Sequence, residues 1–167
     1  ENRVIIVVKF PVPTETPAYE MVCAVVSENS KDYVINISEQ DVVVVKEISR
    51  DADTCEISDF ASAMIAEIQQ KHGVKVLIGI SSVVDNLKDL ARAYKEARIA
   101  FEVGKVFDIE KPIMAYESLG IGRLIYQLPI PLCKMFIREI FEGKSPDDFD
   151  EETLTTIKKF FENNLNV

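Results

Sequence analysis

Two acidic residues, Glu39 and Asp41, lie in a short polar stretch between two apolar runs of this 167-residue chain. Carboxylates are the side chains that hold divalent cations such as Mg²⁺ in proteins. Such a cation needs further oxygen ligands, and no partner carboxylate of fitting spacing accompanies them. We therefore interpret Glu39 and Asp41 as solvated turn carboxylates, and we assign no metal ligand.

Nucleophilic catalysis has little support in the residue types present. His72 is the only histidine, and it stands just before Gly73, where its charge would complement the end of a helix. No G-x-S-x-G motif offers a serine nucleophile. The cysteines form no C-x-x-C pair and are odd in number, so neither a disulfide framework nor a zinc cluster is expected, and we interpret them as small core or boundary residues: Cys23, Cys55 and Cys133.

Phosphate-binding loops are also missing from the sequence. Gly120-Ile121-Gly122 is not part of a G-x-G-x-x-G fingerprint, and there is no G-x-x-x-x-G-K-[ST] loop. We therefore assign no catalytic residue and no cofactor, and we expect no enzymatic activity.

The composition limits the partners of the chain. A formal net charge of -9 disfavours a nucleic-acid surface, because phosphate contacts need clustered Lys and Arg. No apolar run approaches the roughly 20 residues of a membrane span, so no membrane partner is expected. The cysteine pattern fits a reducing cytoplasm. Because Glu1 leads directly into an apolar run, we expect the chain to be a piece of a longer protein.

Hydrophobic periodicity predicts an α+β chain. The expected strands are residues 3–10, 33–38, 41–48, 74–80 and 113–116. The expected helices are residues 17–28, 58–72, 87–104, 120–128, 132–141 and 151–167. Their order is that of a ferredoxin-like sheet covered by helices, followed by a helical appendage, and it predicts a domain over residues 1–118 and a connector over residues 119–167.

Local signals define several of these boundaries. Ser58 is the expected N-cap of the second helix, and Asp150 that of the last. Pro129 and Pro131 are expected to separate two short helices, and residues 143–150 to form a turn. Residues 38–41 leave room only for a tight hairpin without an Asn-Gly signal, so its turn type stays open.

The helix expected over residues 87–104 is the clearest in the chain. Tyr94 and Phe101 lie on its apolar stripe, where core packing is favoured over the alternative of an effector pocket. Glu96 belongs to the charged positions on the other side. The acidic stretch 147–152 is better explained by a helix cap and a solvated face than by a partner site.

Three segments in succession resemble the GGDEF-like domain of the CdaR/PucR family of sugar-diacid and purine catabolism regulators. They are Val76-Leu77-Ile78-Gly79-Ile80-Ser81, Leu90-Ala91-Arg92-Ala93-Tyr94-Lys95-Glu96-Ala97 and Tyr116-Glu117-Ser118-Leu119-Gly120-Ile121. The ending, Leu154 to Val167, is similar to the helix that leads into that family's C-terminal helix-turn-helix. The resemblance implies a nucleotidyl-cyclase-like fold in a DNA-binding regulator, but a fold does not carry activity with it.

Two departures from the catalytic relatives of that family predict a degenerate site. Lys9-Phe10-Pro11 stands where a metal-binding aspartate would be expected, and the segment before it contains no acid. The Gly-Gly-Asp-Glu-Phe position aligns with Ser38-Glu39-Gln40-Asp41-Val42, which lacks both glycines and places side chains where a nucleotide would lie.

The expected function is a non-catalytic regulatory and dimerisation module, which relays an effector or an upstream domain's state through residues 119–167. DNA would be bound only by a helix-turn-helix outside this chain, and a homodimer is expected from the symmetry of operators. Two alternatives stay open: a sensor domain that binds a small-molecule effector, such as an organic acid or purine product, and an atypical nucleotidyl cyclase.

Overall fold

The computed structural model describes residues 2–26, 31–49, 54–106, 111–140 and 150–162. The chain divides into two units, Glu1–Leu119 and Gly120–Val167. Within the described ranges, no helix is long and apolar enough to cross a membrane.

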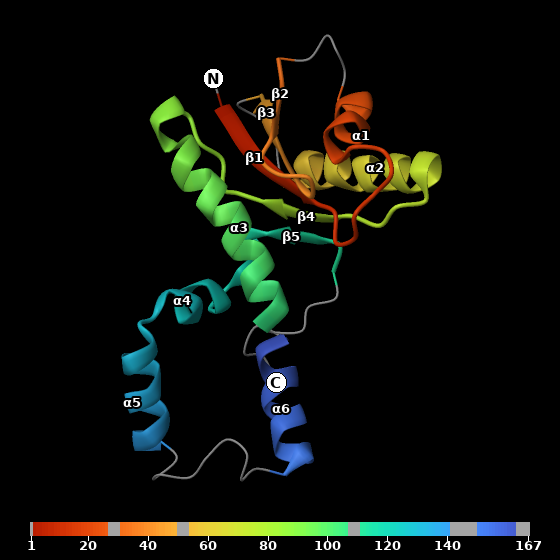
Figure 1. The fold of residues 1–167 in the computed structure, drawn as a ribbon. Coiled ribbons are helices and arrows are strands. Elements are labelled where there is room, and N and C mark those ends of the chain that lie inside the picture. The colour runs from red at the N-terminus through yellow and green to blue at the C-terminus, as the bar shows by residue number, and fades with distance from the viewer. Residues whose placement is uncertain (1, 27–30, 50–53, 107–110, 141–149, 163–167) are drawn as a thin grey trace. The chain divides into compact units, whose positions relative to one another are not determined.

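The first unit is built on a five-stranded sheet with β1 at its centre (Figure 1). Its strands are β1 (Asn2–Lys9), β2 (Tyr33–Asn36), β3 (Asp41–Ile48), β4 (Leu77–Ile80) and β5 (Ile113–Ala115). The spatial order is β2-β3-β1-β4-β5, with β5 parallel to β4 and every other neighbouring pair antiparallel. This is the ferredoxin-like order with one added strand, so the predicted α+β sheet is confirmed.

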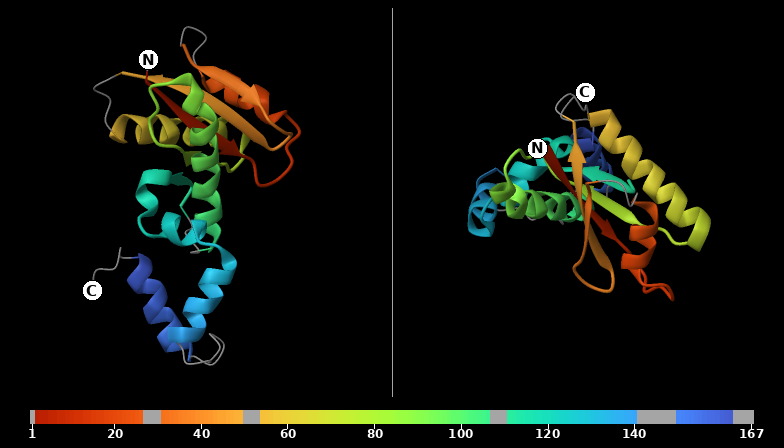
Figure 2. Two further views of the ribbon diagram at one scale, coloured as in Figure 1. Left: turned by 90° about the vertical axis from the view of Figure 1, so that its left-hand side faces the viewer. Right: turned by 90° about the horizontal axis from the view of Figure 1, so that it is seen from above.

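Three helices cover the two faces of this sheet. Helices α1 (Ala18–Val25) and α2 (Thr54–His72) pack on one face, and α3 (Leu90–Val106), which follows a short 3-10 turn at Leu87–Asp89, packs on the other. Figure 2 shows α2 and α3 on opposite sides of the strands. Strand β1 is therefore apolar on both faces because both are covered.

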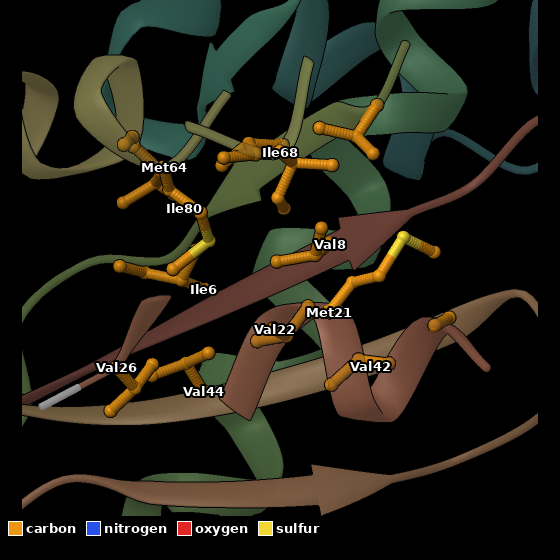
Figure 3. Packing of buried hydrophobic residues seen from close by; sticks show 14 of the residues in the cluster. Ile6, Val8, Met21, Val22, Val26, Val42, Val44, Met64, Ile68 and Ile80 are labelled. Atoms are coloured by element: carbon orange, nitrogen blue, oxygen red, sulfur yellow. The ribbon is translucent and has the colours of Figure 1, made fainter. Parts of the chain in front are cut away.

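The larger core lies between the sheet, α1 and α2. Each fully buried aliphatic side chain in it contributes roughly 1.5–3 kcal/mol of transfer free energy. Figure 3 shows side chains from strands and helices meeting there, among them Ile6, Val8, Met21, Val22, Met64 and Ile68. The smaller core joins Ile5, Val7, Val43 and Val45 to α3, where three alanines let the helix approach the sheet closely: Ala93, Ala97 and Ala100.

Some predicted boundaries in the first unit are wrong. Helix α2 begins at Thr54, one turn before the expected cap at Ser58, because buried Ile57 extends the stripe that continues through Ala61 and Met64. Strand β4 begins at Leu77 and not at residue 74, since β1 pairs with it only from Leu77 onward. Helix α1 ends at Val25, and the last residues of its predicted range lie outside the described residues.

The described residues of the second unit form the helices α4 (Gly122–Gln127), α5 (Ile130–Ile140) and α6 (Glu151–Glu162). Pro131 does not separate two helices as expected but lies in the first turn of α5, where its missing N–H is not needed by the helix. Pro129 precedes the helix, and its carbonyl accepts the N–H of Leu132 (2.9 Å) and of Cys133 (3.1 Å).

The predicted N-cap of the last helix is confirmed. The Thr153 N–H donates to Asp150 Oδ1 at 2.6 Å, and hydrogen bonding from the Thr153 side chain and backbone lowers the pKa of this carboxyl below its ordinary value. The turn predicted over residues 143–150 lies outside the described residues, apart from Asp150 itself. The role of residues 119–167 as a connector stays a prediction.

Candidate functional site

The β2–β3 hairpin, where a nucleotide would lie in a cyclase, is closed by a serine and not by glycines. Ser38 Oγ accepts the N–H groups of Gln40 (3.2 Å) and Asp41 (3.0 Å), and it donates to Asp41 Oδ2 (3.2 Å). The N–H groups of Ile37 and Ser38 both donate to the Asp41 carbonyl at 3.1 Å. A hydroxyl that bonds its own backbone two and three residues on replaces the missing Asn-Gly signal.

The carboxylate of Asp41 also faces a lysine on the central strand. Lys9, the last residue of β1, is the register partner of Asp41, and Lys9 Nζ lies 3.7 Å from Asp41 Oδ1. The two side chains are 34% and 32% exposed. An ion pair this exposed contributes only about 0–1 kcal/mol to the free energy of unfolding. Its significance is that the Lys9 ammonium group lies beside the carboxylate of Asp41, where a metal ion would have to bind.

The residue after Lys9 fixes the end of β1 to the same hairpin. The Phe10 N–H donates to the Gln40 carbonyl at 2.8 Å, and the Phe10 ring is 1% exposed. At the position where the catalytic relatives are expected to carry a metal-binding aspartate, this chain therefore has the cation of Lys9, followed by the buried ring of Phe10. Glu39, the other acid of the hairpin, is exposed.

No cluster of three or more His, Cys, Asp or Glu side chains that could hold a metal ion occurs among the residues the structure describes. Oxygen-ligated cations such as Mg²⁺ draw on carboxylates, and here the hairpin supplies one acid already contacted by Lys9 and Ser38. The absence of assigned metal, cofactor and catalytic residues stays a prediction.

A second polar cluster lies where β4 leads toward α3, and the sequence pattern missed it. Glu96 is 7% exposed and not on the solvent side as expected. Glu96 Oε2 accepts the Ser82 hydroxyl and the Ser82 N–H (3.1 Å), while Oε1 accepts Arg92 Nη1 at 2.5 Å. The hydrogen bond to Glu96, with its charge, raises the pKa of Arg92 above its ordinary value.

The neighbouring Ser81 ties this loop to the central strand. Ser81 Oγ accepts the Ile5 N–H at 3.0 Å and donates to the Ser82 carbonyl at 2.7 Å. The signal that could have revealed the cluster is a Ser-Ser pair directly after a buried strand, with Arg92 one helical turn before Glu96. The cluster holds the start of α3 against the sheet, because it joins loop, helix and β1.

The other residues considered from the sequence, His72, Tyr94 and Phe101, lie at a helix end or in the core. His72 is exposed in the last turn of α2, before Gly73 at φ +67°, as a helix end requires. Phe101 is buried in the smaller core, and Tyr94 packs half-buried against it, so core packing is confirmed for both.

The cysteines fit the sequence interpretation only in part. Cys23 and Cys133 are half-buried, which agrees with boundary positions. Cys55 is exposed near the start of α2, so its interpretation as a core or boundary residue is wrong. The helix begins earlier than expected, and the Cys55 position falls outside its apolar stripe.

The sheet order and the covering helices define a nucleotidyl-cyclase-like α+β domain. A family model described as a GGDEF-like domain matches residues 1–103, and the chain belongs to that family. No curated protein matches the chain. The family covers β1 to most of α3, including the hairpin and both polar clusters.

Proposed function

We propose that this chain is the non-catalytic regulatory and dimerisation portion of a bacterial DNA-binding transcription regulator of the CdaR/PucR type. The observation that carries the proposal is the Lys9–Asp41 ion pair, in which a lysine stands where the cyclase reaction needs a metal-binding acid. A cation on β1 opposes divalent metal binding beside Asp41, since like charges repel. The GGDEF-like fold is then available for regulation and not for nucleotidyl transfer.

The helices of the second unit support a relay role. Helix α5 exposes a series of large apolar side chains, namely Ile130, Leu132, Met135, Phe136 and Ile137. Exposed apolar patches of this kind mark interaction surfaces. Helices that gain their packing from a partner can respond to an effector or to an upstream domain.

DNA binding is assigned to a helix-turn-helix outside these 167 residues. The net charge of -9 disfavours phosphate contacts by this chain, because such contacts need clustered Lys and Arg. Because a bacterial regulator of this type acts on DNA, the same proposal places the protein in the cytoplasm.

A mobility-shift assay with the intact regulator and promoter fragments from its source genome tests the proposal. We expect sequence-specific binding by the intact protein, which persists over competitor DNA, and no binding by residues 1–167 alone. The 167-residue chain is the matched control because it keeps the GGDEF-like domain and the helices. Absence of sequence-specific binding by the intact protein would remove the proposed function.

A further inference from the structure

The outer edge of the sheet carries an apolar row on β2 and on the residue directly after it. Tyr33, Ile35 and Ile37 are 62%, 45% and 49% exposed. Their neighbours across the hairpin, Val45 and Val43, are buried in the core with α3. The row therefore lies on the same face of the sheet as α3. It is exposed because α3 does not extend as far as the edge strand.

The backbone of the same strand offers hydrogen-bonding groups along its outer side. The Ile37 N–H points inward, since it donates to the Asp41 carbonyl of the hairpin partner. Backbone groups alternate in direction along an antiparallel strand, so those of Val34 and Asn36 point away from β3. In the part of the chain that the structure describes, β2 is the last strand on this side.

This edge strand is four residues long, and apart from that short length it lacks the features that usually protect an exposed strand. Proteins place Lys, Pro or a bulge on such edges to prevent pairing with another chain. From Tyr33 to Ser38 there is neither a charged residue nor a proline, and β2 pairs with β3 in continuous register. The edge is suited to the addition of another strand.

We infer that β2 pairs antiparallel with β2 of a second copy of this chain, around a twofold axis at Ile35. In this register Ile35 lies opposite the partner's Ile35, and Tyr33 lies opposite the partner's Ile37. Val34 lies opposite the partner's Asn36, and these are the residues whose backbone groups point outward. The apolar row and the hydrogen-bonding edge thus match in one register, as a self-complementary twofold interface requires.

Charge complementarity selects the second copy as the occupant. Lys31 precedes β2 and lies 3.4 Å from Glu47 of β3, and Glu39 lies in the turn after β2; both are exposed. Antiparallel pairing centred on Ile35 brings the end of each strand near Lys31 beside the partner's hairpin turn, which carries Glu39. Opposite charges then meet at both ends of the interface, while Asp32 stays paired with Lys46 of its own chain.

This inference rests on the dimerisation in the proposed function and names the surface that forms it. The test is sedimentation equilibrium on the full chain, which measures association without reference to DNA. We expect a dimer of twice 18.8 kDa. Ile35→Lys should raise the dimer dissociation constant at least about tenfold, because two lysines would then face each other on the axis. Leu87→Lys is the matched control, since Leu87 is 75% exposed and lies outside β2.

A charge exchange tests the register itself. Glu39→Lys should weaken the dimer by placing lysines opposite each other, and adding Lys31→Glu should restore association. A general structural effect of either substitution would not be reversed in this way. Circular dichroism of each variant checks that the fold is kept.

Three results would overturn the inference: a monomer at all concentrations, a dimer unaffected by Ile35→Lys, or no restoration in the exchanged variant. If Phe136→Lys on α5 dissociates the dimer and Ile35→Lys does not, the contacts lie in the second unit. A monomer at all concentrations would also remove the dimerisation part of the proposed function, whereas the other two results would leave that part intact. Sequence-specific DNA binding by the intact regulator tests the regulator assignment independently of the dimer surface.

Discussion

A Gly79→Ala chain is expected to be about 2–3 kcal/mol less stable to unfolding than the wild-type chain. Gly79 lies in β4, where α3 crosses the sheet. A methyl group there would overlap the Ala97 carbonyl oxygen and lie 2.7 Å from Phe101 Cε2. Since the first of these atoms is helix backbone, relief requires α3 to move away from β4. Urea denaturation monitored by circular dichroism measures the loss.

Gly104→Ala is the matched control for this prediction. A methyl group at Gly104 would overlap Met114 Sδ, and because Met114 is 7% exposed this side chain must turn within the smaller core. Alanine favours a helix interior over glycine by about 1 kcal/mol, and a side chain can move where helix backbone cannot, so the loss should be smaller than that of Gly79→Ala. A loss larger than that of Gly79→Ala would show that the overlap with helix backbone is not the dominant effect.

Glu96→Ala is expected to cost about 2–3 kcal/mol of unfolding free energy. It removes the acceptor for the Ser82 N–H and hydroxyl and the nearer of the two carboxylates beside the Arg92 guanidinium, which keeps Asp89 at 3.6 Å. Because Glu96 is 7% exposed, water cannot easily replace all of these bonds. Chemical denaturation measures the loss, and faster hydrogen exchange at the Ser82 amide reports its location.

Two variants separate this effect from a general effect on α3. Glu96→Gln keeps an oxygen acceptor for Ser82 and should lose only about 1 kcal/mol. Lys95→Ala changes the neighbouring exposed position and should be close to neutral. Equal losses for all three variants would show that the polar cluster is not the cause.

The strands and their order were predictable because the β-branched runs are long and are bounded by prolines or short polar segments. Residues 4–8 and 42–45 are uninterrupted β-branched apolar runs, which indicate strands from the sequence alone. The serine-closed hairpin and the early start of α2 were not predictable from standard turn and cap signals. Ser38 acts through its side chain, and Ile57 extends the helix by packing.

The polar clusters were harder to predict because a charged residue type does not reveal when its side chain is buried. Glu96 was assigned to solvent by its charge, although Ser82 and Arg92 satisfy it in a buried position. The absence of an acid in β1 was visible in the sequence, but the pairing of Lys9 with Asp41 depends on strand register. The exposure of Tyr33 and Ile35 likewise depends on how far α3 extends across the sheet.

The most direct test of the central claim is incubation of the 167-residue chain with GTP or ATP and Mg²⁺ or Mn²⁺, with phosphate-containing products separated by chromatography. Because Lys9 contacts the hairpin carboxylate, we predict no turnover and no saturable heat on titration with metal and nucleotide. Metal-dependent formation of a cyclic nucleotide or dinucleotide by the wild-type chain, lost in Asp41→Asn, would contradict the account.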